Sequence, residues 1–482
     1  MTDGLPPAPP ARPASHRTWN DVILGLLLMG VMAAELLARM SDQPTVQVIA
    51  WLAMAATILA AVRRIGLREI YLLSVCAVLS LLVWWQRPDP TMELAGALSQ
   101  ASFLMAFVLL LGLLHEAAAT SPSIDALGRY LSRQPAGRRF YALFAGTGIM
   151  AVLFNIGVVS FLVPLIQRGI RSSAPDDPLN PIRERRQVSA LLRGFAWCVI
   201  WSPTAIAPLA LMELIPGVDR KLWMVLGLGI FVIYMILGAT EDSFRWRAYR
   251  PRAKQVRPVF PGHAALMFAA ACGWLFVLAI VVSHMLDETI IFGLMAVCPF
   301  MLVGWIIVQN RAGGQVAWPK VGSRLNQIAF TNLPHSARVA VTLACSGFIG
   351  RAAASLVPAQ AVATRLGLDA VPDFLLLSCV PPAIAAMSLL GLSPIMTAVF
   401  FGSFFGSLAV MPADPTLIAL SISMGWSLSM YLSPFATVVL MANRVGGYAP
   451  RDLTWKWNFV YGMLSLALSV PLFALLAAVV HT

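Results

Sequence analysis

The clearest shortage in this sequence is of charged residues. Only 12% of its 482 residues are Asp, Glu, Lys or Arg, whereas 59% are hydrophobic. Water-soluble domains average about 25% charged and about 45–50% apolar residues, so a soluble protein of this length could not bury so much apolar surface. The mean hydropathy of +0.78 therefore predicts an all-α membrane protein that crosses the bilayer many times.

Paired cysteines and clustered histidines are also absent. The six cysteines stand singly in apolar stretches, so neither a disulfide framework nor a zinc site is predicted. The histidines are dispersed and no motif surrounds them, at His16, His115, His263, His284, His335 and His481. A membrane-embedded enzyme acting on lipid or polyprenyl substrates would need a polar catalytic cluster. That class is kept only as an alternative, and we predict no enzyme activity and no cofactor.

Long apolar runs define the expected spans. Each must cover about 30 Å of hydrocarbon, which takes roughly 20 helical residues. Eleven runs qualify, near residues 20–38, 45–62, 69–85, 94–115, 188–214, 221–240, 263–284, 288–308, 337–353, 415–443 and 457–480. Two further apolar segments, 139–168 and 373–410, are interrupted in the middle, which favours re-entrant helical hairpins. The Pro- and Ala-rich segment 1–18 predicts a disordered tail.

The distribution of Lys and Arg predicts the orientation. If the N-terminus is cytoplasmic and both hairpins return to their own side, 26 of the 34 basic residues lie on the cytoplasmic side. This bias matches the positive-inside rule and predicts that the C-terminus lies outside, in the inner membrane of a bacterium. The net charge of +12 is then a consequence of topology, so no nucleic-acid partner is predicted.

Two parts of the sequence echo each other in the same order. The segment His115–Thr120 resembles Gly350–Ser355, and each precedes an amphipathic arm and an interrupted hairpin. A helix broken at Ser-Pro follows in both parts, at Ser202-Pro203 and at Ser433-Pro434. We therefore divide the chain into N-terminal spans (19–93), a first repeat (94–240), a basic cytoplasmic loop (241–262), linking spans with a cytoplasmic loop (263–336) and a second repeat (337–482). Inverted repeats with broken helices are typical of secondary transporters.

The two Ser-Pro elements predict a binding site at the middle of the membrane. Proline removes a backbone donor and opens the helix, and opened backbone is tolerated there only beside protein or a water-filled cavity. The freed carbonyls and hydroxyls suit Na⁺, and the helix N-termini favour an anion. The alternative is that each Ser-Pro is only a kink. The candidate residues on the broken helices are Ser202, Pro203, Thr204, Ser433, Pro434 and Thr437.

The hairpin ends are expected to supply the opposing walls of that site. Asn155 and Gly157 interrupt the first hairpin, although a buried Asn can also simply bond a neighbouring helix. Ser393-Pro394 forms a turn in the second hairpin by composition, and Thr397 follows in its return arm. We therefore place Na⁺, as a candidate coupling ion, at Asn155, Ser202, Ser393 and Ser433.

This layout resembles the ion transporter superfamily, in particular its divalent anion:sodium symporter branch. The resemblance rests on eleven spans, two opposed hairpins each followed by a broken helix, and amphipathic arms, and it covers most of residues 20–480. It implies a homodimer and an elevator-like movement of the hairpin-bearing part. That branch carries Ser-Asn-Thr at each hairpin tip, whereas here only Asn155 and Ser393 correspond to it.

The leading hypothesis is cation-coupled transport of a small carboxylate or inorganic oxyanion, with Na⁺ or H⁺ as the coupling ion. An antiporter or exporter, for Na⁺/H⁺ exchange or a metalloid, is the alternative within transport. No acidic residue lies clearly at the middle of an apolar run, which argues against a proton relay of Asp and Glu side chains.

Overall fold

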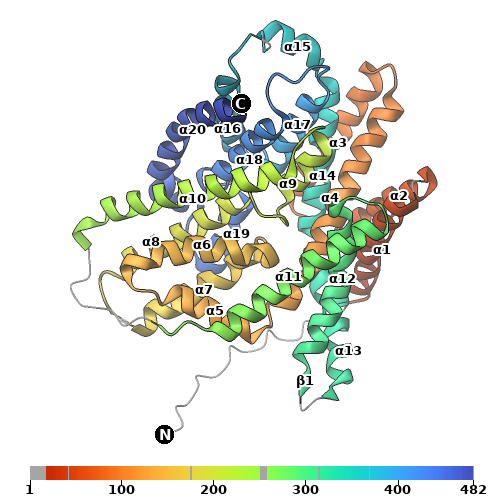
Figure 1. Ribbon diagram of the computed structural model, residues 1–482. Helices are drawn as coiled ribbons and strands as arrows, with labels where there is room; N and C mark the ends of the chain where they lie inside the picture. Colours follow the sequence, from red (N-terminus) through yellow and green to blue (C-terminus); the bar gives the residue numbers. More distant parts are fainter. Residues whose placement is uncertain are drawn as a thin grey trace.

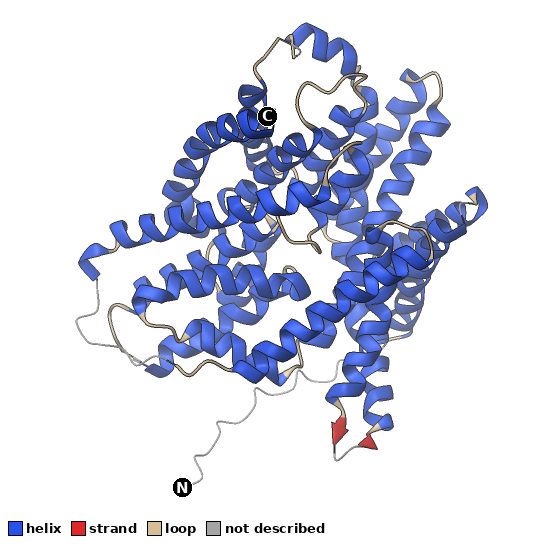
Figure 2. Ribbon diagram, viewed as in Figure 1, coloured by secondary structure: helices blue, strands red, loops and turns tan. Residues whose placement is uncertain are grey.

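The computed structural model describes residues 18–41, 43–173, 176–249, 258–312, 315–368 and 370–480, and these are almost entirely helical (Figure 2). The strands in these ranges, β1 (Arg311–Ala312) and β2 (Gln315–Val316), pair antiparallel with Arg311 opposite Val316. Ten helical segments of the described chain are long and apolar enough to cross a bilayer. The predicted all-α polytopic membrane fold is therefore confirmed. Residues 1–17 of the tail expected at 1–18, and residues 250–257 of the basic loop, lie outside the described residues.

The expected span missing from these ten segments is 188–214. Two helices cover it, α8 (Asn180–Cys198) and α9 (Ile206–Leu214), and residues 199–205 between them are not helical. Nine residues rise only about 13 Å along a helix, so α9 cannot cross a bilayer alone. α8 carries four arginines and a glutamate, which lowers its hydropathy.

Two long helices, α4 (Pro90–Ala118) and α14 (Leu333–Leu356), pack against each other at the centre of the fold. The approach is close, because a Cβ atom at Gly347 would lie 2.7 Å from Leu104 Cδ1. Around this pair lie the remaining helices of the N-terminal and middle parts of the chain (Figure 1). They are α1 (Trp19–Ser41), α2 (Pro44–Ala61), α3 (Leu67–Gln86), α11 (Gly262–Met285), α12 (Ile290–Gln309), α13 (Trp318–Gln327) and η2 (Ile328–Asn332). Their exposed Leu and Trp side chains suit contact with lipid.

The same order of helices follows α4 and α14. After α4 come α5 (Pro122–Ser132), α6 (Ala136–Phe154), α7 (Gly157–Ser173), α8, α9, α10 (Arg220–Arg245) and η1 (Arg247–Tyr249). After α14 come α15 (Ala359–Leu366), α16 (Asp373–Leu389), α17 (Pro394–Gly406), α18 (Pro415–Leu432), α19 (Thr437–Gly446), η3 (Asp452–Asn458) and α20 (Phe459–Val480). The short arms α5 and α15 lie at opposite ends of the molecule in Figure 1.

Matching glycines let each broken helix pack tightly on the first arm of its own hairpin. A Cβ atom at Gly194 of α8 would lie 2.2 Å from the Phe144 carbonyl oxygen of α6. A Cβ atom at Gly425 of α18 would lie 2.8 Å from Ile384 Cβ of α16. Real Cβ contacts are longer than this, so only glycine allows these backbones to approach.

Candidate functional site

The first hairpin turns at Asn155, between the end of α6 and the start of α7. Asn155 has φ 47° and ψ −134°, a positive φ that asparagine tolerates better than most residues. Its backbone N–H donates to the Ala151 carbonyl oxygen at 2.8 Å, which ends α6. The residue is half-buried, and its side-chain amide makes no hydrogen bond within the described part of the chain. The hairpin end therefore presents a free amide.

Gly157 begins α7 and packs directly against His115 of α4. A Cβ atom at Gly157 would lie 2.1 Å from His115 Nδ1. The His115 ring also meets the Phe154 ring edge-on at 5.8 Å, so it is enclosed by the turn. Gly157 is thus placed where the hairpin end contacts the central helix pair, and it has a packing reason to be glycine.

This contact leads to a stability prediction. Gly157→Ala is expected to destabilise the protein by about 1–3 kcal/mol, because the added methyl group must push a buried ring out of place. The measurement is the thermal unfolding midpoint of the protein purified in detergent. Gly169→Ala, in the same helix, is the matched control, because a Cβ atom there meets nothing within 4 Å. Equal midpoints for the two variants would contradict the packing argument.

The second hairpin turns over residues 390–393. Gly391 has φ 89°, and Pro394 occupies the first turn of α17, where its missing N–H costs nothing. Ser393 lies before it and is buried, although its hydroxyl does not cap the helix. The Thr397 hydroxyl donates to the Pro394 carbonyl oxygen at 3.0 Å. The Ser393 hydroxyl is therefore not used to cap α17.

Hydroxyl groups at the two breaks bond to the hairpins. Thr204 Oγ1 donates to the Val152 carbonyl oxygen of α6 at 2.7 Å, and it lies 3.2 Å from Ser202 Oγ. Ser433 Oγ donates to the Ser388 carbonyl oxygen of α16 at 2.7 Å. Both acceptors belong to the last turn of a helix, where carbonyls lack the usual donor four residues later, although the Ser388 oxygen also accepts from the Gly391 N–H at 3.1 Å. Each break is thus tied to the end of its own hairpin arm, and each hydroxyl keeps acceptor capacity.

A similar hydrogen bond supplies a donor to a carbonyl oxygen that a proline inside α16 leaves without its helical partner. Pro381 has no N–H, so the Leu377 carbonyl oxygen four residues earlier loses its helical donor. Ser421 Oγ of α18 donates to that oxygen at 2.6 Å. Ser421 of α18 therefore helps to hold the second hairpin in place.

The second halves of the broken helices pack on the hairpins of the opposite unit. α9 contacts α17, and α19 contacts α7. Along α17, a Cβ atom at Gly402 would approach Leu211 and one at Gly406 would approach the Leu214 carbonyl oxygen. Residue numbers increase in the same direction along both helices, so α9 and α17 run parallel. Likewise, a Cβ atom at Gly446 would approach Val163.

The parallel pairing brings predicted site residues of different units together. The N-terminal end of α9, after Pro203 and Thr204, lies on the same side as the N-terminal end of α17 at Ser393-Pro394. α19, which follows Ser433-Pro434, contacts α7, which begins at Gly157. Two helix N-termini that point the same way concentrate backbone N–H groups and favour negative charge. Thr437 itself is exposed at the start of α19.

Polar contacts at the far ends of these pairs fix them in place. Gln167 Nε2 of α7 donates to Glu184 Oε1 at 2.7 Å and to the Gly446 carbonyl oxygen at 2.9 Å. Tyr448 also donates to Glu184; burial and this carboxylate raise the pKa of Tyr448.

In the loop before α8, the Leu179 N–H and the Arg183 guanidinium lower the pKa of Asp177.

The buried arginine of α8, Arg193, forms a polar cluster that the sequence pattern does not indicate. Arg193 is 2% exposed and donates to Glu241 Oε2 of α10 and to Asn458 Oδ1 of η3, both at 2.8 Å. Its guanidinium carbon lies 4.1 Å from the centre of the Tyr461 ring. In sequence Arg193 stands near a helix end, and its partners are 48 and 265 positions away, so no local pattern points to them.

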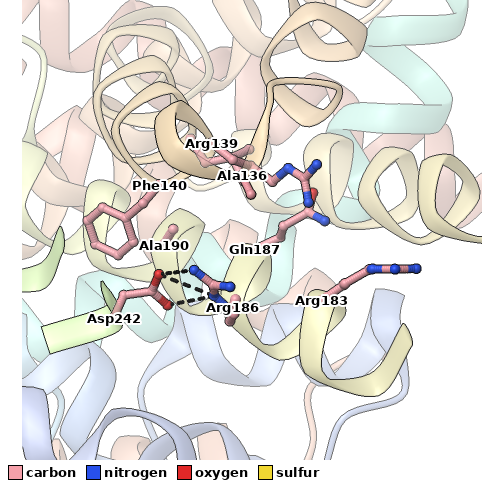
Figure 3. Close-up of a pocket in the computed structure, with 9 residues that line it drawn as sticks. Ala136, Arg139, Phe140, Arg183, Arg186, Gln187, Ala190 and Asp242 are labelled. Carbon is pink, nitrogen blue, oxygen red and sulfur yellow. Dashed lines mark hydrogen bonds and ion pairs between the residues drawn. The ribbon is translucent and has the colours of Figure 1, made fainter. Parts of the chain in front are cut away.

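A second ion pair joins the same two helices at a small cavity of about 30 Å³. Figure 3 shows Arg186 of α8 bonded to Asp242 of α10, with Arg139 and Arg183 also lining the cavity. Arg186 Nη2 lies 2.7 Å from Asp242 Oδ2. The two ion pairs hold α8 against α10. The described residues contain no group of three or more His, Cys, Asp or Glu that could bind a metal ion.

Comparisons with known proteins identify the fold. No protein-family model matches the chain, and no curated protein matches it either. Among solved structures, it is similar to the YdaH transporter of Alcanivorax borkumensis, described as having an unusual topology. The match has a TM-score of 0.52 at 15% sequence identity and covers 85% of this chain and 98% of that one. At this identity the likeness shows a shared fold.

Proposed function

We propose that this protein is a secondary transporter that moves a small anion across the membrane together with a cation. The observation that carries the proposal is the crossed pairing of helices, in which α9 contacts α17 and α19 contacts α7. Each pair joins the break of one unit to the hairpin end of the other. Such breaks are tolerated within a membrane where they line a solute site. The likeness to the YdaH transporter supports the same class.

The chemistry at the paired ends accounts for both solutes. The N–H groups at the starts of α7, α9, α17 and α19 favour a carboxylate or an oxyanion. The Asn155 amide oxygen and the Ser202, Ser393 and Ser433 hydroxyl oxygens are hard ligands of the kind that Na⁺ prefers. We assign Na⁺ rather than H⁺ as the coupling ion, because these oxygens do not titrate.

The movement proposed is a displacement of the two hairpins and broken helices relative to α4 and α14. α17 packs on α14, and α6 contacts α4, so such a displacement slides each hairpin along a central helix. The central helices are held by the surrounding spans, including the ion pair between Glu69 of α3 and Arg338 of α14 at 2.9 Å. We further propose that those spans form a homodimer in the cytoplasmic membrane, with the N-terminus inside.

Flux across a sealed membrane tests the function. Purified protein in proteoliposomes is expected to take up radiolabelled succinate, citrate or sulfate only when an inward Na⁺ gradient is imposed. Replacing Na⁺ by choline should reduce the initial rate to that of protein-free vesicles. Proton flux driven by acidification in the absence of any anion would instead identify an antiporter, and hydrolysis of added lipid would identify an enzyme. Either result would overturn the proposal.

A further inference from the structure

A cavity of about 470 Å³ lies away from the paired helix starts, between the central helices and the second hairpin. Its wall is formed by the start of α4 and the end of α14 on one side, and by α15 and the last turns of α17 on the other. Ser403 of α17 lies ten residues after Ser393, which is about 15 Å along a helix. The cavity is therefore separate from the site proposed above.

Two arginines give the cavity its charge. Arg351 and Arg87 line it, and neither guanidinium has a carboxylate within ion-pair distance in the described ranges. The Arg87 guanidinium makes a weak hydrogen bond, from Nη2 to the Val357 carbonyl oxygen at 3.4 Å. Arg351 lies against α4, since a Cβ atom at Gly96 would be in ordinary van der Waals contact with Arg351 Nε at 3.6 Å. Glu93 also lines the cavity, so the three groups sum to a single positive charge.

A buried hydroxyl also lacks a partner at this cavity. Ser403 is 3% exposed, and its Oγ makes no hydrogen bond within the described residues. An unpaired buried hydroxyl costs about 1–3 kcal/mol, which a ligand would recover. Ser355 and Ser407 add hydroxyl groups to the same wall.

We propose that this cavity is an entry site for a small organic carboxylate, before the anion reaches the paired helix starts. The carboxylate pairs with Arg351 and Arg87, and Ser403 Oγ donates to one of its oxygens. Glu93 accepts from an N–H or O–H group elsewhere on the same molecule, which favours an amino or hydroxy acid over a simple dianion. A volume of about 470 Å³ is in the range of small-molecule sites, about 300–1,000 Å³. The direction in which the anion moves on from this cavity rests on the proposed function. Binding of the carboxylate in the cavity does not.

Binding to the full-length protein in detergent tests the site without transport. The probes are glutamate, malate, succinate and acetate, measured by calorimetry against wild type, Arg351→Gln, Ser403→Ala and Arg365→Gln. Arg365 is exposed on the neighbouring arm α15 and does not line the cavity. We expect glutamate or malate to bind more tightly than succinate and acetate. Arg351→Gln should weaken that binding at least tenfold and Ser403→Ala about threefold, with Arg365→Gln unchanged.

The outcomes separate this inference from the proposed function. Asn155→Ala should keep carboxylate binding at the cavity while losing transport. If Arg351→Gln binds like wild type, or if Arg365→Gln weakens binding equally, the entry site is wrong even where transport persists. Displacement of the bound probe by phosphatidylglycerol, with no carboxylate binding in lipid-containing micelles, would identify a lipid site and overturn the proposal. Binding without any flux would leave the cavity in place and overturn the proposed function.

Discussion

Asn155→Ala and Ser433→Ala are each expected to reduce Na⁺-driven anion uptake to the level of empty vesicles. Asn155 supplies the free amide at the end of the first hairpin. Ser433 supplies both a hydroxyl at the second break and the bond to the Ser388 carbonyl oxygen at 2.7 Å. Removing that donor leaves the Ser388 carbonyl oxygen with only its bond from the Gly391 N–H at 3.1 Å, at a cost of about 1 kcal/mol. The hairpin end is then no longer held against the broken helix, and the oxygen ligands lose their relative positions.

The backbone at Asn155 requires a second variant. Its positive φ strains most residues by about 1–3 kcal/mol, so Asn155→Ala could act through folding alone. Asn155→Gly relieves the backbone but still lacks the amide, and we expect it to fold normally and to transport no better than Asn155→Ala. The measurement is uptake in proteoliposomes at matched protein density, with monodispersity as the check on folding.

The matched hydroxyl control is Ser74→Ala. Ser74 lies on α3, and its hydroxyl donates within its own helix to the Ile70 carbonyl oxygen at 3.0 Å. It should transport at the wild-type rate. Full transport by both Asn155→Gly and Ser433→Ala would show that the paired helix ends are only structural.

The sequence predicts the breaks better than it predicts what the breaks contact. Pro203, Pro434 and Pro394 mark helix boundaries because proline removes a donor, a local effect that can be read from the chain. Asn155 interrupts an apolar run for an equally local reason. The contact of α9 with α17 depends on Gly402 and Gly406 meeting Leu211 and Leu214. Glycine and leucine are common in every span, so composition does not identify this pair.

The hydrogen-bond acceptors of the hydroxyl groups are equally hard to predict from the sequence. Ser433 and Thr204 are singled out by their place beside proline, but their acceptors, the Ser388 and Val152 carbonyl oxygens, are 45 and 52 positions away. Any carbonyl in the last turn of a neighbouring helix would satisfy them equally well. Local chemistry therefore predicts which residues are available, and tertiary packing decides which are used.

Arg193→Met is expected to cost up to about 3 kcal/mol of folding stability, the lower end of the effect of removing one partner from a buried ion pair, because Glu241 keeps a second ion pair with Arg245 at 3.2 Å. Arg193 and Glu241 have side chains 3% and 6% exposed, and their N–O distance is 2.8 Å. The mutation also removes the donor to Asn458 Oδ1 and the cation over the Tyr461 ring. The measurement is the unfolding midpoint in detergent, followed by tryptophan fluorescence, to which the buried Trp197 and Trp223 contribute.

A double variant decides whether the weakened pairing of Glu241 is the cause. Arg193→Met combined with Glu241→Gln removes both buried charges, and it leaves only Arg245, whose side chain is 29% exposed, without its carboxylate. Most of the lost stability should therefore return. Lys456→Met is the exposed control: the Lys456–Asp452 pair has side chains 72% and 39% exposed, and such pairs contribute at most about 1 kcal/mol. If the double variant is no more stable than Arg193→Met, the loss comes from packing around Tyr461. The ion pair would then be dispensable to the clamp between α8 and α10, and Arg186–Asp242 would be sufficient to hold the broken helix in place.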